Sequence, residues 1–298
     1  MSVRVWRPGF ALDLGAVLSP LGRGGGDPTF RRTPGGAIFL AANTPAGPGT
    51  LGVTRTGGDV HAEAWGEGAD FLLEGLPDLL GASDDDSDFV SHHDIVAEAR
   101  RRMPGLRLGS SGRVWDVLVP AVLEQKVTGK EAWRSWRELC HRFGTVAPGP
   151  ARLYVPPAPR ALMSINDWEW HRAGVDSARR RALIGAAQVA TRLERAAELK
   201  GAEGRALLRK IPGIGVWTAA EIAQRAWGDP DAVSFGDFHI AGNVGYALTG
   251  KPVDDEGMFA LLAPYAPQRQ RAVRYIEAAG IVKPRRGPRF SPRDYRAI

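Results

Sequence analysis

Apolar residues in the first part of the chain follow the two-residue period of β-strands. Val3 and Val5 alternate with arginines, and residues 57–59, of sequence GGD, have the composition of a tight hairpin turn. A short segment with helical spacing follows. Residues 1–83 are therefore predicted to form a small mixed α/β N-terminal domain. The other apolar segments are residues 37–42, 52–56 and 60–64, with strand character, and 71–80, with helical character.

The spacing changes to that of helices after a polar segment. Residues 81–89 (GASDDDSDF) have the composition of a linker, and their acidic run is expected to be solvated. Apolar residues then repeat at helical spacing from Val114 to Val122. We predict a helical region over residues 84–282 and a basic C-terminal tail over 283–298. The expected helices are residues 90–103, 114–128, 132–143, one capped by Asp176 or Ser177 and running to 199, one following Gly215, 254–263 and 268–280.

A glycine-rich turn separates two helical segments within residues 208–240. Its sequence is Pro212-Gly213-Ile214-Gly215. Proline ends the first helix, and the glycines are expected to take positive φ and to admit another backbone closely. The N-terminus of the next helix follows at once, and its N–H groups suit a phosphate. The alternative is an ordinary helical hairpin in an all-α domain.

A single carboxylate, Asp237, follows Gly215 by 22 residues. It stands where another helix is expected to begin. Aspartate is a favoured helix N-cap, so one interpretation of this residue is structural. The other interpretation is a reactive carboxylate, and both can hold together.

These features resemble those of a known enzyme family. The sequence LRKIPGIGVWTA with the later aspartate resembles the helix-hairpin-helix (HhH-GPD) motif of base-excision DNA glycosylases, which carry a Gly/Pro-rich loop and a following aspartate. The wider stretch is similar to bacterial 3-methyladenine DNA glycosylase II, the AlkA type. Residues 103–132 resemble the segment that carries the lesion-probing loop in that branch. The order of elements is similar over nearly the whole chain.

The resemblance implies a fold and a reaction. The fold would be α+β, a small mixed α/β N-terminal domain followed by a mostly α-helical HhH-GPD region of two subdomains. The reaction would be monofunctional hydrolysis of the N-glycosidic bond of alkylated, 3-methyladenine-type bases, with damaged double-stranded DNA as the partner. The alternatives are a glycosylase for a deaminated or oxidised purine and a non-catalytic helix-hairpin-helix DNA-binding protein.

The resemblance assigns catalysis to Asp237. Cleavage creates positive charge on the sugar, which a buried anion stabilises, and the same carboxylate can activate the attacking water. Bifunctional relatives have a lysine nucleophile two residues past the second hairpin glycine, where this chain has Trp217. The nearest lysine of the motif, Lys210, precedes the turn and is expected to point away. The expected product is therefore an intact abasic site.

The base pocket is expected to be aromatic, because a flipped base stacks on aromatic faces. By resemblance, Trp217 and Phe238 match aromatic residues of that pocket. Glu221 stands at the position of a tyrosine, and Gln268 or a neighbour at that of a tryptophan. Glu221 has two interpretations: an anion that attracts a cationic alkylated base, or one half of an exposed i,i+4 pair with Arg225.

The resemblance also implies DNA contacts at two turns. Relatives insert a leucine into the duplex where this chain has Lys126. The alternatives are gap filling by Lys126 or by Gln125, a phosphate contact by Lys126, and a cation that stabilises a helix C-terminus. A monovalent cation, Na⁺ or K⁺, at the hairpin carbonyls is implied, and no other metal. The expected DNA-binding residues are Gly213, Gly215, Val216, Thr218, Gln125, Lys126 and His239.

Composition narrows the remaining choices. The chain has 298 residues and a formal net charge of +6, a mild indication of a polyanionic partner. One cysteine, Cys140, excludes internal disulfides and a four-cysteine cluster, so no iron–sulfur cofactor is expected. No apolar run has the length of a membrane span, and the first residues do not form a signal peptide. We expect a cytoplasmic monomer that acts on chromosomal DNA.

Overall fold

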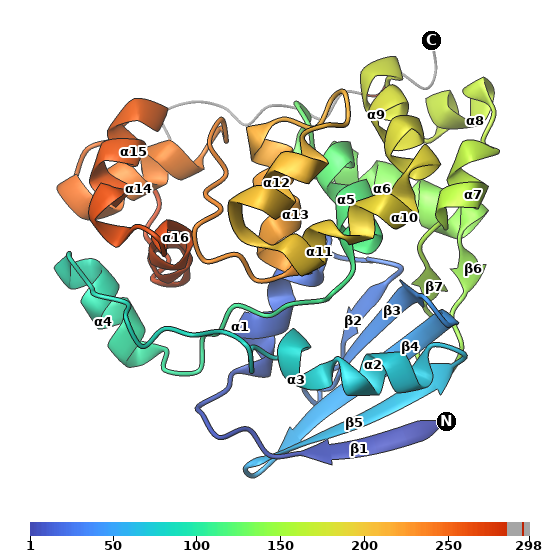
Figure 1. The fold of residues 1–298 in the computed structure, drawn as a ribbon, viewed down its shortest axis with the longest axis horizontal. Helices are drawn as coiled ribbons and strands as arrows, with labels where there is room; N and C mark the ends of the chain where they lie inside the picture. The colour runs from blue at the N-terminus through green and yellow to red at the C-terminus, as the bar shows by residue number, and fades with distance from the viewer. Residues whose placement is uncertain (285–293, 295–298) are drawn as a thin grey trace.

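A computed structural model of the chain describes residues 1–284 and residue 294. Most of the predicted basic tail, residues 283–298, thus lies outside the described residues. A β-sheet with short helices forms the N-terminal part, and a larger body of helices follows it (Figure 1). The predicted α+β fold class is confirmed. In the described part of the chain, no helix combines the length and apolar character needed to cross a membrane.

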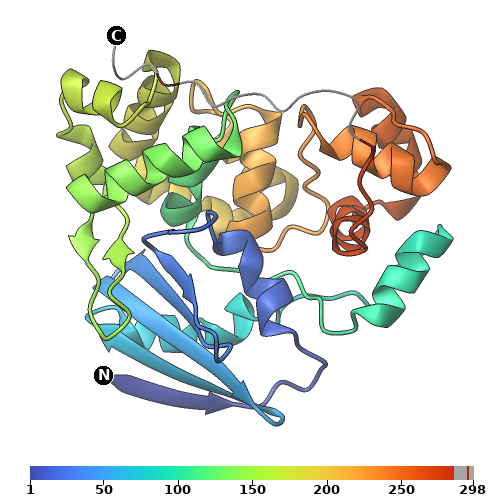
Figure 2. The same cartoon turned by 180° about the vertical axis from the view of Figure 1, so that it is seen from behind.

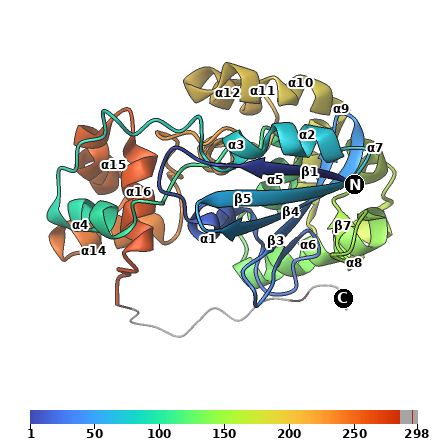
Figure 3. The same cartoon turned by 90° about the horizontal axis from the view of Figure 1, so that it is seen from below.

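The N-terminal part is built on a five-stranded sheet of order β1-β5-β4-β3-β2, in which all neighbouring strands are antiparallel. Strand β5 alternates buried and exposed residues, so one face of the sheet is apolar. Helix α2 packs on that face, and Figure 3 shows α2 and α3 along one side of the sheet. The predicted hairpin turn joins β4 to β5, with Thr56 paired to Asp59. The elements are β1 (Ser2–Trp6), α1 (Leu14–Leu18), η1 (Ser19–Leu21), β2 (Phe30–Arg32), β3 (Ile38–Thr44), β4 (Gly47–Thr56), β5 (Asp59–Gly66), α2 (Ala69–Glu74) and α3 (Leu76–Leu79).

The helical body has two apolar cores. The larger core gathers around α5, which is buried on all sides, and includes one face of α6, α9 and α13. The exposed β6 lies outside this core, and Val155 of β7 belongs to a smaller cluster with Ala41 of β3. The elements of this part of the chain are α5 (Val114–Leu123), α6 (Gly129–Phe143), β6 (Thr145–Val146), β7 (Tyr154–Val155), α7 (Pro159–Met163), α8 (Asp167–Arg172), α9 (Ser177–Gln188), α10 (Ala190–Glu194), α11 (Ala196–Leu199), α12 (Gly201–Leu208) and α13 (Val216–Ala226).

The second core joins segments that are far apart in the sequence. Helix α4 (Asp94–Arg102) packs with α16 (Arg269–Ala278), and α14 (Ile240–Thr249), α15 (Asp255–Leu262) and η2 (Ala263–Tyr265) complete the group. Figures 1 and 2 show this group on one side of the molecule, beside the larger core. Helix α13 belongs to the larger core, and Val233 and Phe235 of the segment after it pack into the second core, so this segment connects the two.

Several predicted helices end earlier than expected. The helix predicted over residues 114–128 ends at Leu123, because Thr128 is the N-cap of α6 and forms a capping box with Glu131. The helix that Asp176 caps, as predicted, is divided into α9, α10 and α11 before residue 200. Residues 71–80 likewise divide between α2 and α3.

The expectation of a solvated acidic run at residues 84–88 is wrong for Asp84 and Asp86, whereas Asp85 and Asp88 are exposed. Both oxygens of Asp84 accept hydrogen bonds from the Arg271 guanidinium, at 2.5 and 3.0 Å. The two side chains are 2% and 1% exposed. Asp86 pairs with Arg100 and Arg107. The acidic run therefore ties α4 and α16 together through partners that are distant in the sequence.

Candidate active site

The glycine-rich turn connects α12 to α13, and its two glycines differ in conformation. Gly213 has φ +92°, and a Cβ there would lie 2.9 Å from the Cβ of Ala182. Gly215 is the N-cap of α13 with φ −90°, and a Cβ there would have no atom within 4 Å. The expectation of positive φ is thus met at Gly213 and wrong at Gly215. Gly215 leaves open space beside the first N–H groups of α13.

A side chain from the turn after α5 holds the hairpin. The Gln125 Nε2 group donates to the Gly213 carbonyl and to Thr218 Oγ1, both at 2.8 Å. Thr218 is 3% exposed, so its hydroxyl serves the fold. The next residue, Lys126, is exposed and has φ +55°, which places it at the tip of the turn. The structure thus joins the two predicted DNA-contact regions through Gln125.

Asp237 lies beside the start of α13 and before α14. Its Oδ1 atom accepts the backbone N–H groups of His239 (2.7 Å) and Ile240 (3.0 Å). Its Oδ2 atom accepts the Trp217 indole N–H at 3.1 Å. The N-cap of α14 is His239, so the N-cap interpretation of Asp237 is wrong. The carboxylate nevertheless accepts the first N–H groups of α14, and the helix that follows the hairpin orients it through Trp217.

Three predicted contact residues lie exposed near this carboxylate. Phe238 is 73% exposed and Val216 is 46% exposed. The ring of His239, also exposed, meets the Phe238 ring edge-on, with centroids 4.9 Å apart. The exposed Phe238 ring and Val216 side chain beside a carboxylate suit a partner that covers this face.

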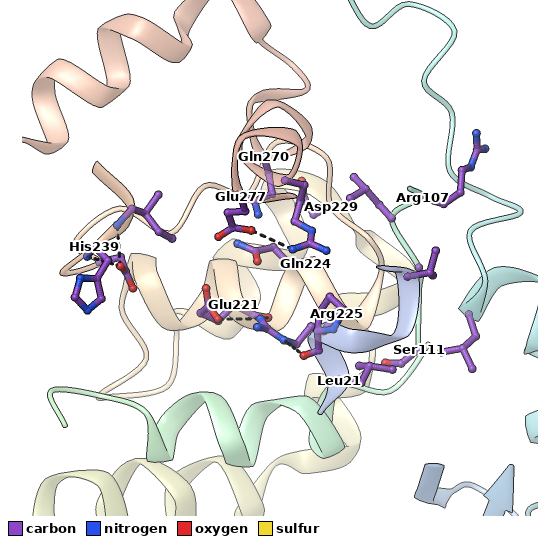
Figure 4. Close-up of a pocket in the computed structure, with 18 of the residues that line it drawn as sticks. Leu21, Arg107, Ser111, Glu221, Gln224, Arg225, Asp229, His239, Gln270 and Glu277 are labelled. Atoms are coloured by element: carbon purple, nitrogen blue, oxygen red, sulfur yellow. Dashed lines mark hydrogen bonds and ion pairs between the residues drawn. The ribbon is translucent and has the colours of Figure 1, made fainter. Parts of the chain in front are cut away.

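A cavity of about 320 Å³ opens next to Asp237 and His239. Figure 4 shows Glu221, Gln224 and Arg225 reaching it from α13, and Gln270 and Glu277 from α16. No phenylalanine, tyrosine or tryptophan lines it among the residues that the structure describes. An aromatic base pocket therefore stays a prediction, which the lining of this cavity does not support. Trp217 and Phe238 lie outside its lining.

Glu221 is buried, with 8% of its surface exposed. It pairs with Arg225 at 2.8 Å and accepts a hydrogen bond from Ser234 Oγ. Arg225 also donates through Nε to the Pro20 carbonyl at 2.8 Å, so the N-terminal part closes this wall. Burial acts to lower the pKa of Arg225, but Glu221 and Glu124 outweigh it and raise that pKa. The predicted exposed Glu221–Arg225 pair is thus a buried one.

The charges around the cavity are largely matched. Three of its four lining carboxylates form ion pairs: Glu221 with Arg225, Asp229 with Arg205, and Glu277 with Arg274. Among the described residues, Asp237 is the lining carboxylate without an ion pair. It is the anion that remains available to a positive charge.

Gln270 is a cavity residue that the sequence did not single out. It is 3% exposed, and its Oε1 atom has no hydrogen-bond partner in the described structure. Gln268, at the position compared with a tryptophan, accepts from Arg271 through Oε1 and lies outside the cavity lining. The sequence comparison pointed to Gln268 or a neighbour, and Gln270, two residues further along α16, is the one that lines the cavity.

The described side chains contain no cluster of three or more His, Cys, Asp or Glu residues suited to a metal ion. The Gly213 carbonyl, one of those at the hairpin, accepts from Gln125. A monovalent cation at the hairpin carbonyls stays a prediction, as does the expected absence of other cofactors.

Comparison with solved structures identifies the fold. The chain is similar to the 3-methyladenine DNA glycosylase from Archaeoglobus fulgidus, with a TM-score of 0.76 and 15% identity over 92% of this chain and 96% of that one. It is also similar to the apo form of Clostridium acetobutylicum 8-oxoguanine glycosylase/lyase (TM-score 0.73, 13% identity, 94% and 96% of the chains). A third match is MBOgg1 in complex with a low-affinity DNA ligand (TM-score 0.72, 17% identity, 94% and 98%).

No family model and no curated protein matches the sequence. The structural similarities nevertheless extend over nearly the whole length of each chain. The chain therefore has the fold of the HhH-GPD DNA glycosylases, as the sequence motif indicated.

Proposed function

We propose that this chain is a monofunctional DNA glycosylase, which hydrolyses the N-glycosidic bond of a damaged base in double-stranded DNA. The observation that carries the proposal is the position of Asp237. It lines the cavity beside the hairpin and has no ion pair among the described residues. An unpaired carboxylate at that place can stabilise the positive charge that develops on the sugar.

The hairpin supports DNA binding in this proposal. Gly215 is exposed, and a backbone phosphate can approach it without meeting a side chain. The N-terminus of α13 favours an anion there. The similar MBOgg1 chain was solved with a DNA ligand, which agrees with a DNA partner for this face.

The proposed mechanism uses water as the nucleophile. Trp217 holds Asp237 Oδ2 through its indole N–H, so it orients the carboxylate and has no amine to attack the sugar. Asp237 stabilises the oxocarbenium-like sugar and accepts a proton from the attacking water. The product is an intact abasic site and the free base.

Two lesion classes are candidates. The sequence resemblance favours an alkylated, 3-methyladenine-type base, which is cationic and leaves readily. The polar cavity favours an oxidised or deaminated purine, because its described lining offers hydrogen-bonding groups and no Phe, Tyr or Trp side chain. A DNA-binding protein without catalysis is the contrasting class.

The test is Asp237→Asn with a panel of modified duplexes. We expect base release to fall about 100- to 1,000-fold or more, as for loss of an electrostatic stabiliser, while binding to abasic-site DNA is retained. Borohydride should trap little enzyme–DNA adduct with the wild-type protein, and Lys210→Ala and Lys126→Ala serve as controls for trapping. Full activity of the variant would refute the role of Asp237. A wild-type protein that releases no base would favour the non-catalytic class.

A further inference from the structure

Two consecutive aspartates stand at the start of α15, and they have different partners. Asp254 is the N-cap of this helix, and its Oδ1 atom accepts the Gly257 backbone N–H at 2.9 Å. The Oδ2 atom of Asp255 instead accepts the backbone N–H of Gly236 at 2.8 Å, although the two residues are 19 positions apart in the chain. Gly236 directly precedes Asp237. One carboxylate therefore caps the helix, and the other connects the helix to the candidate active site.

The Gly236 N–H is the one hydrogen-bond donor to the Asp255 carboxylate in the described part of the chain. The Oδ1 atom of Asp255 is buried and has no partner there. A buried carboxylate oxygen without a donor lowers stability. The position in the first turn of α15 offsets part of this cost, because an anion is favoured at a helix N-terminus. The effect of this carboxylate on its surroundings is thus directed at Gly236.

The segment that Asp255 holds is a tight turn. The Asp237 N–H donates to the Ser234 carbonyl at 3.2 Å, and Gly236 inside this turn has φ +88°. Glycine reaches positive φ readily, but its wide conformational range makes it costly to order. A Cβ at Gly236 would have no atom within 4 Å, so the space around this residue does not restrain it. The hydrogen bond to Asp255 supplies a restraint at this point.

The Asp237 carboxylate is consequently held from two helices that belong to different cores. Trp217, on α13 of the larger core, donates to its Oδ2 atom at 3.1 Å. Asp255, on α15 of the second core, holds the residue before it. Figure 1 shows α13 and α15 in these two separate groups of helices. The place of the carboxylate therefore depends on a contact from each core.

We infer that Asp255 is a positioning residue for Asp237, because it fixes the turn from which that carboxylate extends. This inference rests on the proposed glycosylase function, in which Asp237 stabilises the charged sugar. Such stabilisation needs a group whose place is fixed before the reaction. A displacement of about 1 Å can lower the rate about 100-fold. Asp255 does not line the cavity in the described structure, so it acts through Asp237.

The first experiment measures single-turnover release of whichever modified base the wild-type protein removes fastest. Asp255→Ala removes the acceptor, and the rate should fall about tenfold to a hundredfold, while the affinity for abasic-site DNA should not change. Asp255→Asn keeps an acceptor oxygen at the same size and should restore most of the rate. Asp254→Ala is the matched control. It removes the cap of α15 and should lower the thermal stability, but the rate should stay at the wild-type value where the variant is folded.

The second experiment follows the position of Asp237 without catalysis. The NMR signal of the Trp217 indole N–H reports the bond to Oδ2, and hydrogen exchange at the backbone amides of His239 and Ile240 reports the bonds to Oδ1. Asp255→Ala should shift the indole signal and accelerate exchange at both amides. Asp254→Ala should leave the signal and the exchange unchanged.

Three results would overturn the inference. The first is a wild-type rate and a wild-type indole signal in Asp255→Ala. The second is the same set of changes in Asp254→Ala, which would mean that α15 acts through its stability alone. The third is an Asp255→Asn variant that is folded but as slow as Asp255→Ala. If the wild-type protein releases no base from any duplex, the glycosylase function is refuted instead, and the NMR comparison still decides whether Asp255 positions Asp237.

Discussion

The two sides of the cavity are built from different kinds of interaction. On the hairpin side, backbone groups and neutral side chains set the geometry: Gln125 holds the Gly213 carbonyl, and Trp217 orients Asp237. On the α16 side, buried ion pairs do so, with Arg271 bound to Asp84. The hairpin side therefore offers a carboxylate and free N–H groups to a ligand. On the α16 side, most charges are already paired.

This difference separates two tasks. In the proposed function, a phosphate and a charged sugar would bind groups of fixed position at the surface, namely the helix N-terminus and one anion. The base would enter the cavity, where unpaired charge is costly. Variants that act on one side and spare the other test whether this division holds.

The largest effect is expected at the buried ion pair. Asp84→Asn leaves the Arg271 charge buried with less compensation, and the stability should fall by about 3–5 kcal/mol. The free energy of unfolding is measured by denaturant titration. Base release is then measured at a temperature where the variant is folded.

Asp88→Asn is the matched control for this effect. Asp88 belongs to the same acidic run but is exposed, so its replacement should change stability by about 0.5 kcal/mol or less. Similar losses in the two variants would mean that the acidic run acts through its total charge, and the contrast between the two sides would fail.

A smaller effect is expected at the two hairpin glycines. Gly213→Val forces a β-branched residue to φ +92° and toward Ala182, which should cost about 1–3 kcal/mol of stability. Gly215→Val meets open space at φ −90°, so its cost should be about 1 kcal/mol or less. Both should weaken binding to DNA of any sequence, because phosphate contacts carry no sequence information.

Gly215→Val is therefore the cleaner probe of the hairpin. Binding should be measured over a range of salt concentrations, since a site that neutralises phosphates weakens as salt rises. Wild-type affinity in Gly215→Val, or binding that does not depend on salt, would remove the hairpin from the DNA-binding surface.

The sequence predicted the hairpin side of the cavity better than the α16 side. The β4–β5 turn, the glycine-rich hairpin and the Asp176 cap depend on nearby residues, and the structure has them as predicted. The burial of Glu221 was not foreseen, because Arg225 next to it binds Pro20, 205 residues away in the chain. The Asp84–Arg271 pair spans 187 residues. Long-range pairs of common charged residues leave no local pattern in the sequence. The ion pairs on the α16 side of the cavity could therefore not be predicted.

The smallest effect concerns the Gln125 link between the two turns that are predicted to contact DNA. Gln125→Ala removes hydrogen bonds to the hairpin, each of which contributes about 0.5–1.5 kcal/mol, and Gln125 is half-buried. We expect the free energy of unfolding to fall by about 1 kcal/mol and the backbone amides of the hairpin to exchange hydrogen faster. Lys126→Ala, at an exposed position, should leave both unchanged, but should lower the salt dependence of DNA binding by about one ion if Lys126 contacts a phosphate. If Gln125→Ala instead weakens DNA binding while hairpin exchange stays at the wild-type rate, Gln125 acts on the duplex itself. The backbone of the hairpin alone would then fix its conformation, and the Gln125 hydrogen bonds would not contribute to it.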